Sequence, residues 1–306
     1  MEMTLNEIAQ HWMKEKTKLV KTSTIATYAI NLEKHILPHF GENTQVAEDD
    51  VQEFVYNKAE EGLNIKTVKD ILMLFRMIMK FGSKKGWISY DAWDIKYPKD
   101  NMKNRIQVLT ISEQKALMAH LYDDNSFKNL GLLICLNTGI RIGEICALKW
   151  GDININAGII QIRRTYERIY MINTPTPHST LVMQTPKTIN SARDIPICST
   201  LSHHLRLFIK NVSKNHYILT NSEKPLEPNN YRHHYKRIMK RIGLPLYKFH
   251  TLRHSFATRC IESGCDCKTV SSLLGHSNIS TTLNLYVHPS MEQKRKCIDF
   301  MLKVLD

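Results

Sequence analysis

The segment IKTVKDILMLFRMIMK, residues 65–80, is the clearest indication of the fold of this chain. Its apolar residues recur three or four positions apart, as they do along one face of an α-helix. The apolar stripe consists of Ile65, Val68, Leu72, Phe75 and Met79, and the basic residues around it are Lys66, Lys69, Arg76 and Lys80. The segment therefore predicts a helix that buries one face and presents cations on the rest of its surface.

The residues before this segment also have helical spacing, without an alternating strand pattern. One helix is expected from a Thr4 cap through Lys14, a second from about Thr22 to near Gly41, and a third over 47–61. Four helices of this size form a small bundle. We therefore expect residues 1–97 to be a helical domain, followed by a polar linker over 98–108 that carries Lys99, Lys103 and Arg105.

The second half of the chain has mixed character. Thr110 and Glu113 have capping-box spacing ahead of an apolar run, which predicts a new helix. The segments 158–168 and 181–185 have strand character and suggest an antiparallel meander. Further helices are expected at 201–211, 227–241, 248–262, 267–274 and about 290–304. The predicted fold class is mainly α, with a small antiparallel β-sheet in a C-terminal α+β domain.

Composition narrows the class of protein and of partner. The 306 residues have a net charge of +13, which favours a polyanion as partner, and nucleic acid is the most common one. A basic surface without such a partner is the alternative. No apolar run approaches the roughly 20 residues of a membrane helix, and the N-terminus is amphipathic, so a cytoplasmic protein without a membrane partner is expected. The seven cysteines include no CxxC pair and no common zinc spacing, so free thiols and no metal are expected.

Five short sequence motifs contain several basic residues that precede one tyrosine in the chain. The phrases TGIRIGE, QTPKT, HTLRH, LLGHSN and TTLNLYVHP contain, in order, Arg141, Lys187, His250 with Arg253, His276 and Tyr286. Guanidinium groups match the non-bridging oxygens of a phosphate, and a phenolate can attack phosphorus. The set therefore indicates a phosphodiester substrate.

For each of these residues a phosphate-binding role can be weighed against a purely structural one. Arg141 and Glu144 share a helix face, as either a surface ion pair or an arginine held by a carboxylate and directed at a phosphate. His250 and Arg253 share a face too, which is favourable when an anion lies between them or the imidazole is neutral. His254, on the same predicted helix, is interpreted as structural.

The other members leave more alternatives open. A loop lysine such as Lys187 is usually solvated, and Arg193, Lys210 and Lys214 compete with it. His276 follows Gly275 near a helix end, where it could be a cap. Tyr286 is one of twelve tyrosines, and a phenol needs cationic neighbours to become a nucleophile at neutral pH.

Taken together, these phrases resemble the tyrosine recombinase (phage integrase) family over roughly 108–290. The segment TSTIATYAINLEKHILPHFG, residues 22–41, looks like the helical core-binding domain of that family. The resemblance implies an N-terminal four-helix SAM-like bundle that binds DNA, a mixed α+β catalytic domain over 109–290, and a C-terminal helix over 291–306 that docks into a neighbouring protomer.

The resemblance also implies a transesterification that needs no metal, cofactor or ATP. Arg141 and Arg253 would clamp the scissile phosphate, and Tyr286 would attack phosphorus to form a 3′-phosphotyrosyl link. Lys187 would protonate the 5′-oxygen leaving group.

Three residues would assist this step in the family pattern. His250 would help proton transfer around the nucleophile, His276 would donate a hydrogen bond to the phosphate, and Glu144 would orient the cations. The implied function is that of a site-specific recombinase or integrase of a mobile element.

The implied partners are duplex DNA recombination sites and three further copies of the chain. A homotetramer would form on DNA, with a monomer or weak oligomer when free, and accessory DNA-bending or excision factors are further candidates. The candidate DNA contacts are Lys66, Lys69, Arg76, Lys80, Lys99, Lys103, Arg105, Arg232, Lys236 and Arg237. Because no extra N-terminal arm-site module is visible, a Xer-like dimer-resolving recombinase is an alternative. A type IB topoisomerase and a non-catalytic DNA-binding protein are two others.

Overall fold

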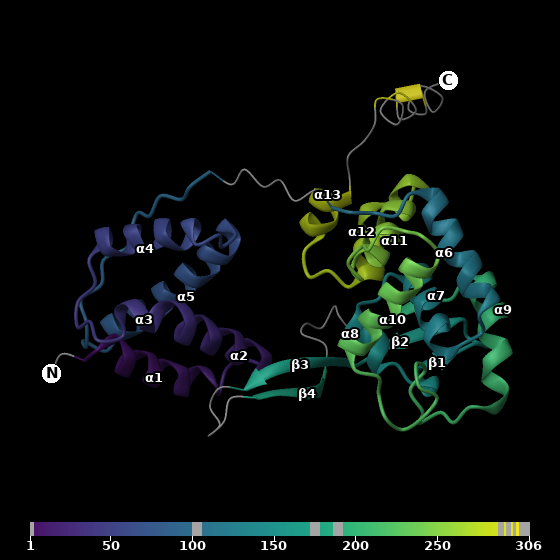
Figure 1. Cartoon of the computed structure of the whole chain (residues 1–306), viewed down its shortest axis with the longest axis horizontal. Helices are drawn as coiled ribbons and strands as arrows, with labels where there is room; N and C mark the ends of the chain where they lie inside the picture. Colours follow the sequence, from purple (N-terminus) through teal and green to yellow (C-terminus); the bar gives the residue numbers. More distant parts are fainter. Residues whose placement is uncertain are drawn as a thin grey trace. The chain divides into compact units, whose positions relative to one another are not determined.

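The computed structural model of the chain describes residues 3–99, 106–171, 178–185 and 192–286, together with Met291, Arg295, Ile298 and Asp299. The chain divides into two compact units (Figure 1). The first comprises 1–104 with 168–180, and the second comprises 105–167 with 181–306. The predicted fold class is confirmed, because helices dominate and the strands form small sheets.

The N-terminal residues form the expected succession of helices. These are α1 (Leu5–Lys16), α2 (Thr22–Asn31), the π-helical turn η1 (Leu32–Ile36), α3 (Leu37–Phe40), α4 (Glu48–Glu60) and α5 (Ile65–Lys84). Thr4 caps α1 in a capping box with Glu7, as the sequence suggests. The elements α2, η1 and α3 follow one another without a break and together form the predicted second helix.

The core of the first unit is built around α5. Four members of its predicted stripe, Val68, Leu72, Phe75 and Met79, are fully buried. The segment after α5 joins this core through Ile88, Trp93 and Ile95. The guanidinium of Arg76 donates to the carbonyl oxygen of Trp93 at 2.8 Å, which ties this segment to α5.

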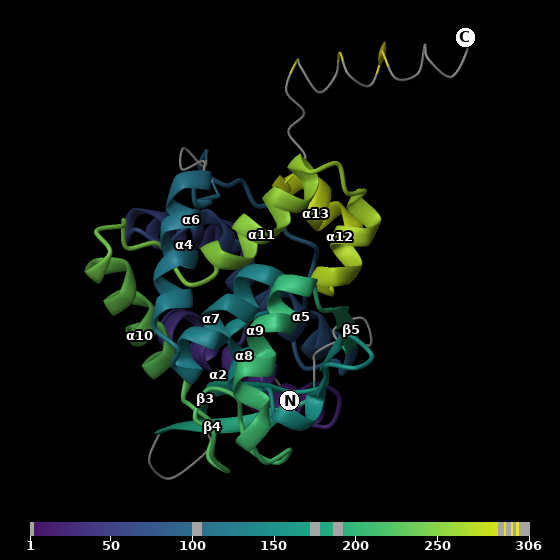
Figure 2. The same cartoon turned by 90° about the vertical axis from the view of Figure 1, so that its right-hand side faces the viewer.

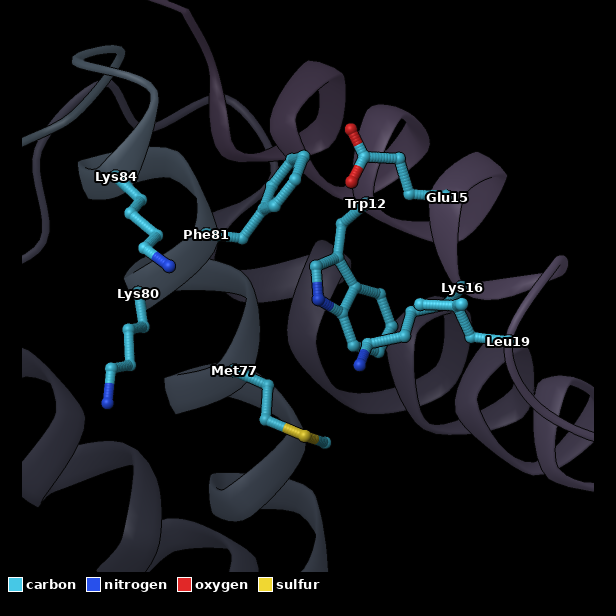
Figure 3. Close-up of a pocket in the computed structure, with 8 residues that line it drawn as sticks. All are labelled: Trp12, Glu15, Lys16, Leu19, Met77, Lys80, Phe81 and Lys84. Carbon is cyan, nitrogen blue, oxygen red and sulfur yellow. The ribbon is translucent and has the colours of Figure 1, made fainter.

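A pocket of about 280 Å³ opens between α1 and α5 within the first unit (Figure 3). It is lined by Trp12, Glu15, Lys16, Leu19, Met77, Lys80, Phe81 and Lys84. Figure 3 shows Lys80, Phe81 and Lys84 extending from α5, and the Trp12 ring on the facing helix α1. The ammonium of Lys16 lies 5.5 Å from the centre of the Trp12 ring. The lining of the pocket therefore combines aromatic rings with basic side chains.

The second unit has its own helical core. Its helices are α6 (Ile111–Asp123), α7 (Phe127–Thr138), α8 (Ile142–Ala147), α9 (Ser199–Phe208), α10 (Pro228–Arg241), α11 (Thr251–Glu262), α12 (Cys267–Leu274) and α13 (Ile279–Tyr286). Short 3₁₀ turns lie at Trp150–Asp152 and Ile209–Asn211. The predicted capping box of Thr110 and Glu113 begins α6. Helix α7 is buried along most of its length and forms the centre of this core.

The strands form two small sheets. Strands β1 (Ile153–Asn154), β2 (Ile159–Ile162) and β5 (Arg193–Pro196) pair antiparallel in the order β1-β2-β5, with Ile160 opposite Ile195. Strands β3 (Thr165–Met171) and β4 (His178–Gln184) form a separate pair. The predicted single meander is therefore wrong, because 158–168 is divided between two sheets. Arg163 and Arg164 lie at the break, where they form ion pairs with Asp194 and Asp152 respectively.

The structure differs from the prediction in two further helices, which contain or adjoin the HTLRH and TTLNLYVHP motifs. The helix predicted over 248–262 begins three residues later, at Thr251, because a turn precedes it in which the Thr251 N–H donates to the Lys248 carbonyl. Helix α13 was not predicted. Helices α11, α12 and α13 contact one another and lie side by side (Figures 1 and 2).

The predicted helix at about 290–304 lies outside the described residues, apart from Met291, Arg295, Ile298 and Asp299. Among the residues that are described, no helix has both the length and the apolar character needed to cross a membrane.

Candidate active site

The site begins at the junction of α7 and α8. Gly139 ends α7 with a left-handed φ of +65°. A Cβ atom on Gly139 would stand 2.5 Å from Cδ1 of Phe256, which leaves no room for a side chain. Two residues later Arg141 forms the N-cap of α8. The tight turn therefore places Arg141 directly beside the end of α7.

Glu144 holds Arg141 from one helical turn away, as their spacing predicts. The Glu144 carboxylate accepts the backbone N–H of Arg141 at 2.8 Å and its Nη1 at 2.9 Å. Glu144 also accepts two hydrogen bonds from Arg193 on β5, at 3.1 and 3.0 Å. Burial opposes ionisation of Glu144, but the hydrogen bonds and charge of Arg193, with Arg141, outweigh it and lower the Glu144 pKa. One buried carboxylate thus fixes two arginines.

The C-terminal end of α12 holds three arginines. The last carbonyls of a helix lack partners within it and carry the negative end of its dipole, so they attract cations. The contacts are Arg193 Nε to Leu273 O at 2.7 Å, Arg253 Nη2 to Leu274 O at 2.8 Å, and Arg141 Nη2 to Gly275 O at 3.3 Å. Side chains from α8, β5 and α11 therefore converge on one helix end.

Arg253 is the most enclosed of these cations, with an exposed fraction of 2%. Its Nη1 donates to the Gly139 carbonyl at 2.8 Å, which links α11 to the end of α7. Burial, followed by the charge of Arg141, lowers the pKa of Arg253 to about 9. The guanidinium is thus still cationic at neutral pH, held by carbonyl oxygens and not by a carboxylate of its own.

His276 lies just beyond the end of α12, after the left-handed cap Gly275, as its position in LLGHSN suggests. Its Nδ1 is 2.8 Å from the hydroxyl oxygen of Thr282 on α13. Partial burial, then the charges of Arg253 and Arg141, lower the pKa of His276 to about 4. The imidazole is therefore neutral at neutral pH, with Nδ1 in contact with Thr282.

Tyr286 is the last residue of α13 and is only 6% exposed. It packs in an apolar cluster with Ala257, Val270 and Leu274. Its hydroxyl oxygen lies 2.7 Å from Nδ1 of His254. Burial raises the pKa of Tyr286, although the nearby charges of Arg253 and Arg141 act in the opposite direction. The phenol is therefore protonated at neutral pH in this arrangement.

Two histidines stand one helical turn apart at the start of α11. His250 is the N-cap of α11, and its ring centre is 4.6 Å from that of His254, edge to face. Part of the His250 side chain faces solvent, yet loss of hydration and the charges of His254 and Arg253 lower its pKa to about 4. Burial and Arg253 also lower the pKa of His254. His254, interpreted as structural from the sequence, contacts the Tyr286 hydroxyl.

The structure brings together most of the predicted catalytic set in the second unit. Arg141, Glu144, Arg253 and His276 gather at the end of α12, and Tyr286 follows on α13 with His250 nearby on α11. The sequence named Arg193 only as a competitor of Lys187, and His254 was interpreted as structural. The signals for them were the basic residue that opens β5 and the repeat of histidine at 250 and 254. Lys187 lies outside the described residues.

The predicted DNA contacts have varied surroundings. Exposed side chains belong to Lys66, Lys69, Lys80, Lys99, Arg232, Lys236 and Arg237. The ammonium of Lys69 stands 4.8 Å from the Tyr97 ring centre, and Arg76 is partly buried by its contact with Trp93. Lys103 and Arg105 lie outside the described residues. Arg76 thus holds the segment around Trp93 against α5 within the first unit.

Comparison with known proteins identifies the family. The phage integrase family model matches residues 107–293, and the SAM-like N-terminal domain of phage integrases matches residues 4–55. The chain therefore belongs to the phage integrase family, and it is a tyrosine-type site-specific recombinase.

Relatives cover nearly the whole chain. A XerC-like tyrosine recombinase of Caldanaerobacter subterraneus is 27% identical over 97% of this chain and 82% of the relative. The XerA tyrosine recombinase of Pyrococcus horikoshii is 26% identical over 94% of this chain and 96% of its own.

Solved structures have the same fold. The integrase of transposon Tn1549, in complex with transposon right end DNA, has a TM-score of 0.81 at 22% identity, covering 98% of this chain and 100% of that one. A lambda integrase tetramer bound to a Holliday junction has a TM-score of 0.66 at 17% identity, covering 95% and 80% respectively.

Proposed function

We propose that this chain cuts and rejoins duplex DNA at a specific site through a 3′-phosphotyrosyl intermediate. The observation that supports this most is the convergence of Arg141, Arg193 and Arg253 on the carbonyls that end α12. Arg141 and Arg193 both pair with the Glu144 carboxylate, which fixes their positions beside Arg253. A phosphodiester is the ligand that such an arrangement of guanidinium groups fits.

In the proposed reaction Arg141 and Arg253 bind the non-bridging oxygens of the scissile phosphate. They stabilise the charge that builds up as phosphorus becomes five-coordinate. The Tyr286 oxygen attacks phosphorus, the bond from phosphorus to the 5′-oxygen breaks, and Lys187 gives a proton to that oxygen. The bond energy is kept in the phosphotyrosyl link, so the reverse attack by a 5′-hydroxyl rejoins the strand without ATP.

The remaining predicted residues act around this phosphate. His276 donates a hydrogen bond to a phosphate oxygen from the ring nitrogen that Thr282 does not contact. His250 assists proton transfer near the nucleophile. Glu144 positions Arg141, and Arg193 positions Glu144 in turn.

The parts of the chain divide the work in this proposal. The helical residues 1–97 and the basic linker 98–108 bind DNA beside the scissile site, residues 109–290 carry out catalysis, and residues 291–306 dock into a neighbouring protomer. The net charge of +13 supports extensive phosphate contact. The similar lambda integrase structure, a tetramer bound to a Holliday junction, supports assembly of four copies on DNA here.

Two biological settings fit this chemistry. Similarity to the integrase of transposon Tn1549 supports a mobile element as the carrier, with accessory DNA-bending or excision factors as further partners. Similarity to Xer recombinases supports a dimer-resolving role instead. The mobile-element setting is our main proposal, because the structural likeness to the transposon integrase extends over almost all of both chains.

The direct test uses a nicked duplex that carries the recombination site and loses a short 5′-hydroxyl strand after cleavage. The wild-type chain should form an adduct that survives denaturant, whereas Tyr286→Phe should bind the duplex with unchanged affinity and form none. An adduct on the Phe variant would contradict the assignment.

A second assay distinguishes the proposed recombinase from a type IB topoisomerase. A type IB topoisomerase relaxes supercoiled plasmid that lacks any recombination site. The proposed recombinase should leave such a plasmid supercoiled, and rapid relaxation would favour the alternative.

A further inference from the structure

We propose that His254 is the general base that takes the proton from Tyr286 as it attacks phosphorus. The second histidine of HTLRH, and not the first, would then serve the nucleophile directly. This inference rests on the proposed function, because it assumes that Tyr286 is the nucleophile.

The geometry places the His254 ring at the reacting oxygen. Its Nδ1 is 2.7 Å from the Tyr286 hydroxyl oxygen, which is within the range of a hydrogen bond between these groups. The two ring centres are 5.6 Å apart, and α11 contacts α13 along this line. A buried phenol needs a polar partner, and the Tyr286 ring packs in an apolar cluster with Ala257, Val270 and Leu274.

The electrostatics of the pair suit a proton transfer from oxygen to nitrogen. Burial raises the pKa of Tyr286, so the phenol keeps its proton at neutral pH and is a poor nucleophile until a base removes it. Burial and the charge of Arg253 lower the pKa of His254, so its imidazole is neutral and can accept a hydrogen bond at Nδ1. The acceptor tautomer carries its own proton on Nε2.

His250 is less well placed for this role. It lies one turn earlier, at the N-cap of α11, and its ring meets the edge or face of His254 at 4.6 Å. The histidine ring that contacts Tyr286 is that of His254. His250 would therefore influence the nucleophile through His254.

The proton balance of the step is complete. As the bond from the Tyr286 oxygen to phosphorus forms, the phenolic proton moves to Nδ1 of His254, and the 5′-oxygen leaves with a proton from Lys187. In the rejoining step the imidazolium returns its proton to the phenol. The imidazolium faces Arg253, His250 and His276, so it is favourable only while the charged phosphate is bound.

The test is single-turnover cleavage of the nicked duplex by His254→Asn between about pH 6 and 8, where Arg253 keeps its charge. Asparagine places an amide oxygen near the position of Nδ1, so it keeps an acceptor but cannot take the proton. At pH 7 we expect cleavage to fall by about 10²- to 10⁴-fold, the usual contribution of a general base, with unchanged DNA affinity. The variant rate should then rise about tenfold per pH unit as the phenol ionises unaided, while the wild-type rate stays nearly flat.

The matched control is His203→Asn, because His203 is exposed on α9 and takes no part in the site. It should cleave as wild type does. A His254→Asn rate or pH profile like that of wild type would overturn the proposal. If His254→Asn binds DNA poorly, the same measurement on His254→Gln decides the question.

A modified substrate separates this role from that of the acid. Sulfur in place of the bridging 5′-oxygen leaves without needing a proton, so it should restore cleavage by Lys187→Ala but not by His254→Asn. Restoration of His254→Asn would mean that His254 supplies the acid, which contradicts the proposal. Failure of the proposed function itself would look different, because the wild-type chain would form no adduct at all.

Discussion

Glu144 and Arg193 illustrate how single residues set the geometry of the site. Arg193 joins the Glu144 carboxylate through two nitrogens and reaches the Leu273 carbonyl with a third. A lysine has one ammonium group and cannot make this planar set of contacts. Since Glu144 also holds Arg141, a change at Arg193 should reach the phosphate-binding arginine without touching the substrate.

We therefore predict that Arg193→Lys slows single-turnover cleavage at saturating DNA by about tenfold or more. It should also lower the free energy of unfolding in urea by roughly 1–3 kcal/mol, because it leaves part of a buried charged network unsatisfied. The control is Arg163→Lys, at an arginine that pairs with Asp194 on the surface. That change should cost no more than about 1 kcal/mol and leave cleavage intact. Equal effects of the two variants would refute the role of Arg193.

At the residue scale the sequence predicted what depends on local spacing. The pairing of Arg141 with Glu144 was one of two readings of their three-residue separation, and the structure shows it between the N-cap and the first turn of α8. The contact of His254 with Tyr286 spans 32 positions and depends on how α11 meets α13. No local pattern contains that information, so the sequence could not assign His254.

The elements around the site are joined at the turn between α7 and α8. Gly139 has a left-handed φ, its missing side chain leaves room for Phe256, and its carbonyl accepts from Arg253. The conformation of this turn thus affects both the packing of α11 against α7 and the position of a guanidinium.

We predict that Gly139→Ala lowers the free energy of unfolding by roughly 2–4 kcal/mol, from backbone strain together with overpacking against Phe256. Cleavage should fall as well, because the Gly139 carbonyl would move away from Arg253. The matched control is Gly243→Ala, at a glycine with a φ of +70° but no atom within 4 Å of an added Cβ. This control should show only the strain, roughly 1 kcal/mol, with cleavage unaffected. The prediction is wrong if Gly139→Ala and Gly243→Ala lower the free energy of unfolding in urea by the same amount.

At the element scale the long amphipathic helices could be predicted, because their stripes and capping boxes are local. The stripe of α5 and the caps of α1 and α6 are examples. Helix α13 escaped prediction because its sequence, ISTTLNLY, is short and rich in residues with modest helix propensity. It is helical in contact with α11 and α12, and such tertiary support is invisible in the sequence. The pairing of β2 with β5 is likewise non-local.

Across the whole molecule, the net positive charge favours binding to a polyanion, whereas several histidines resist protonation because they are partly buried and cations lie near them. A net charge of +13 suits a polyanion, yet His234, His250 and His276 are surrounded by cations and carry lowered pKa values of about 4. Loss of hydration is the first cause in each case. A histidine whose pKa falls on folding binds its proton more weakly in the native state than in the unfolded chain.

The protein should therefore lose stability as the pH falls from about 6.5 towards 4. Above the unfolded pKa of about 6.5 all three rings are neutral in both states, and below it protons favour the unfolded chain. Each ring contributes less than about 1.4 kcal/mol per pH unit, because all three retain solvent contact that screens the effect. The measurement is the thermal unfolding midpoint against pH for wild type and His276→Asn, whose decline should be shallower. An unchanged midpoint across this window would contradict the expectation.

Among the twelve tyrosines of the chain, Tyr286 is the one that we propose forms the covalent bond to DNA. The most direct measurement is to trap the adduct on the nicked duplex, digest it with nuclease and protease, and map the modified residue by mass spectrometry. We predict a nucleotide attached through a 3′-phosphate to the peptide that contains Tyr286. A nucleotide on any other residue, or no adduct from the wild-type chain, would contradict the account.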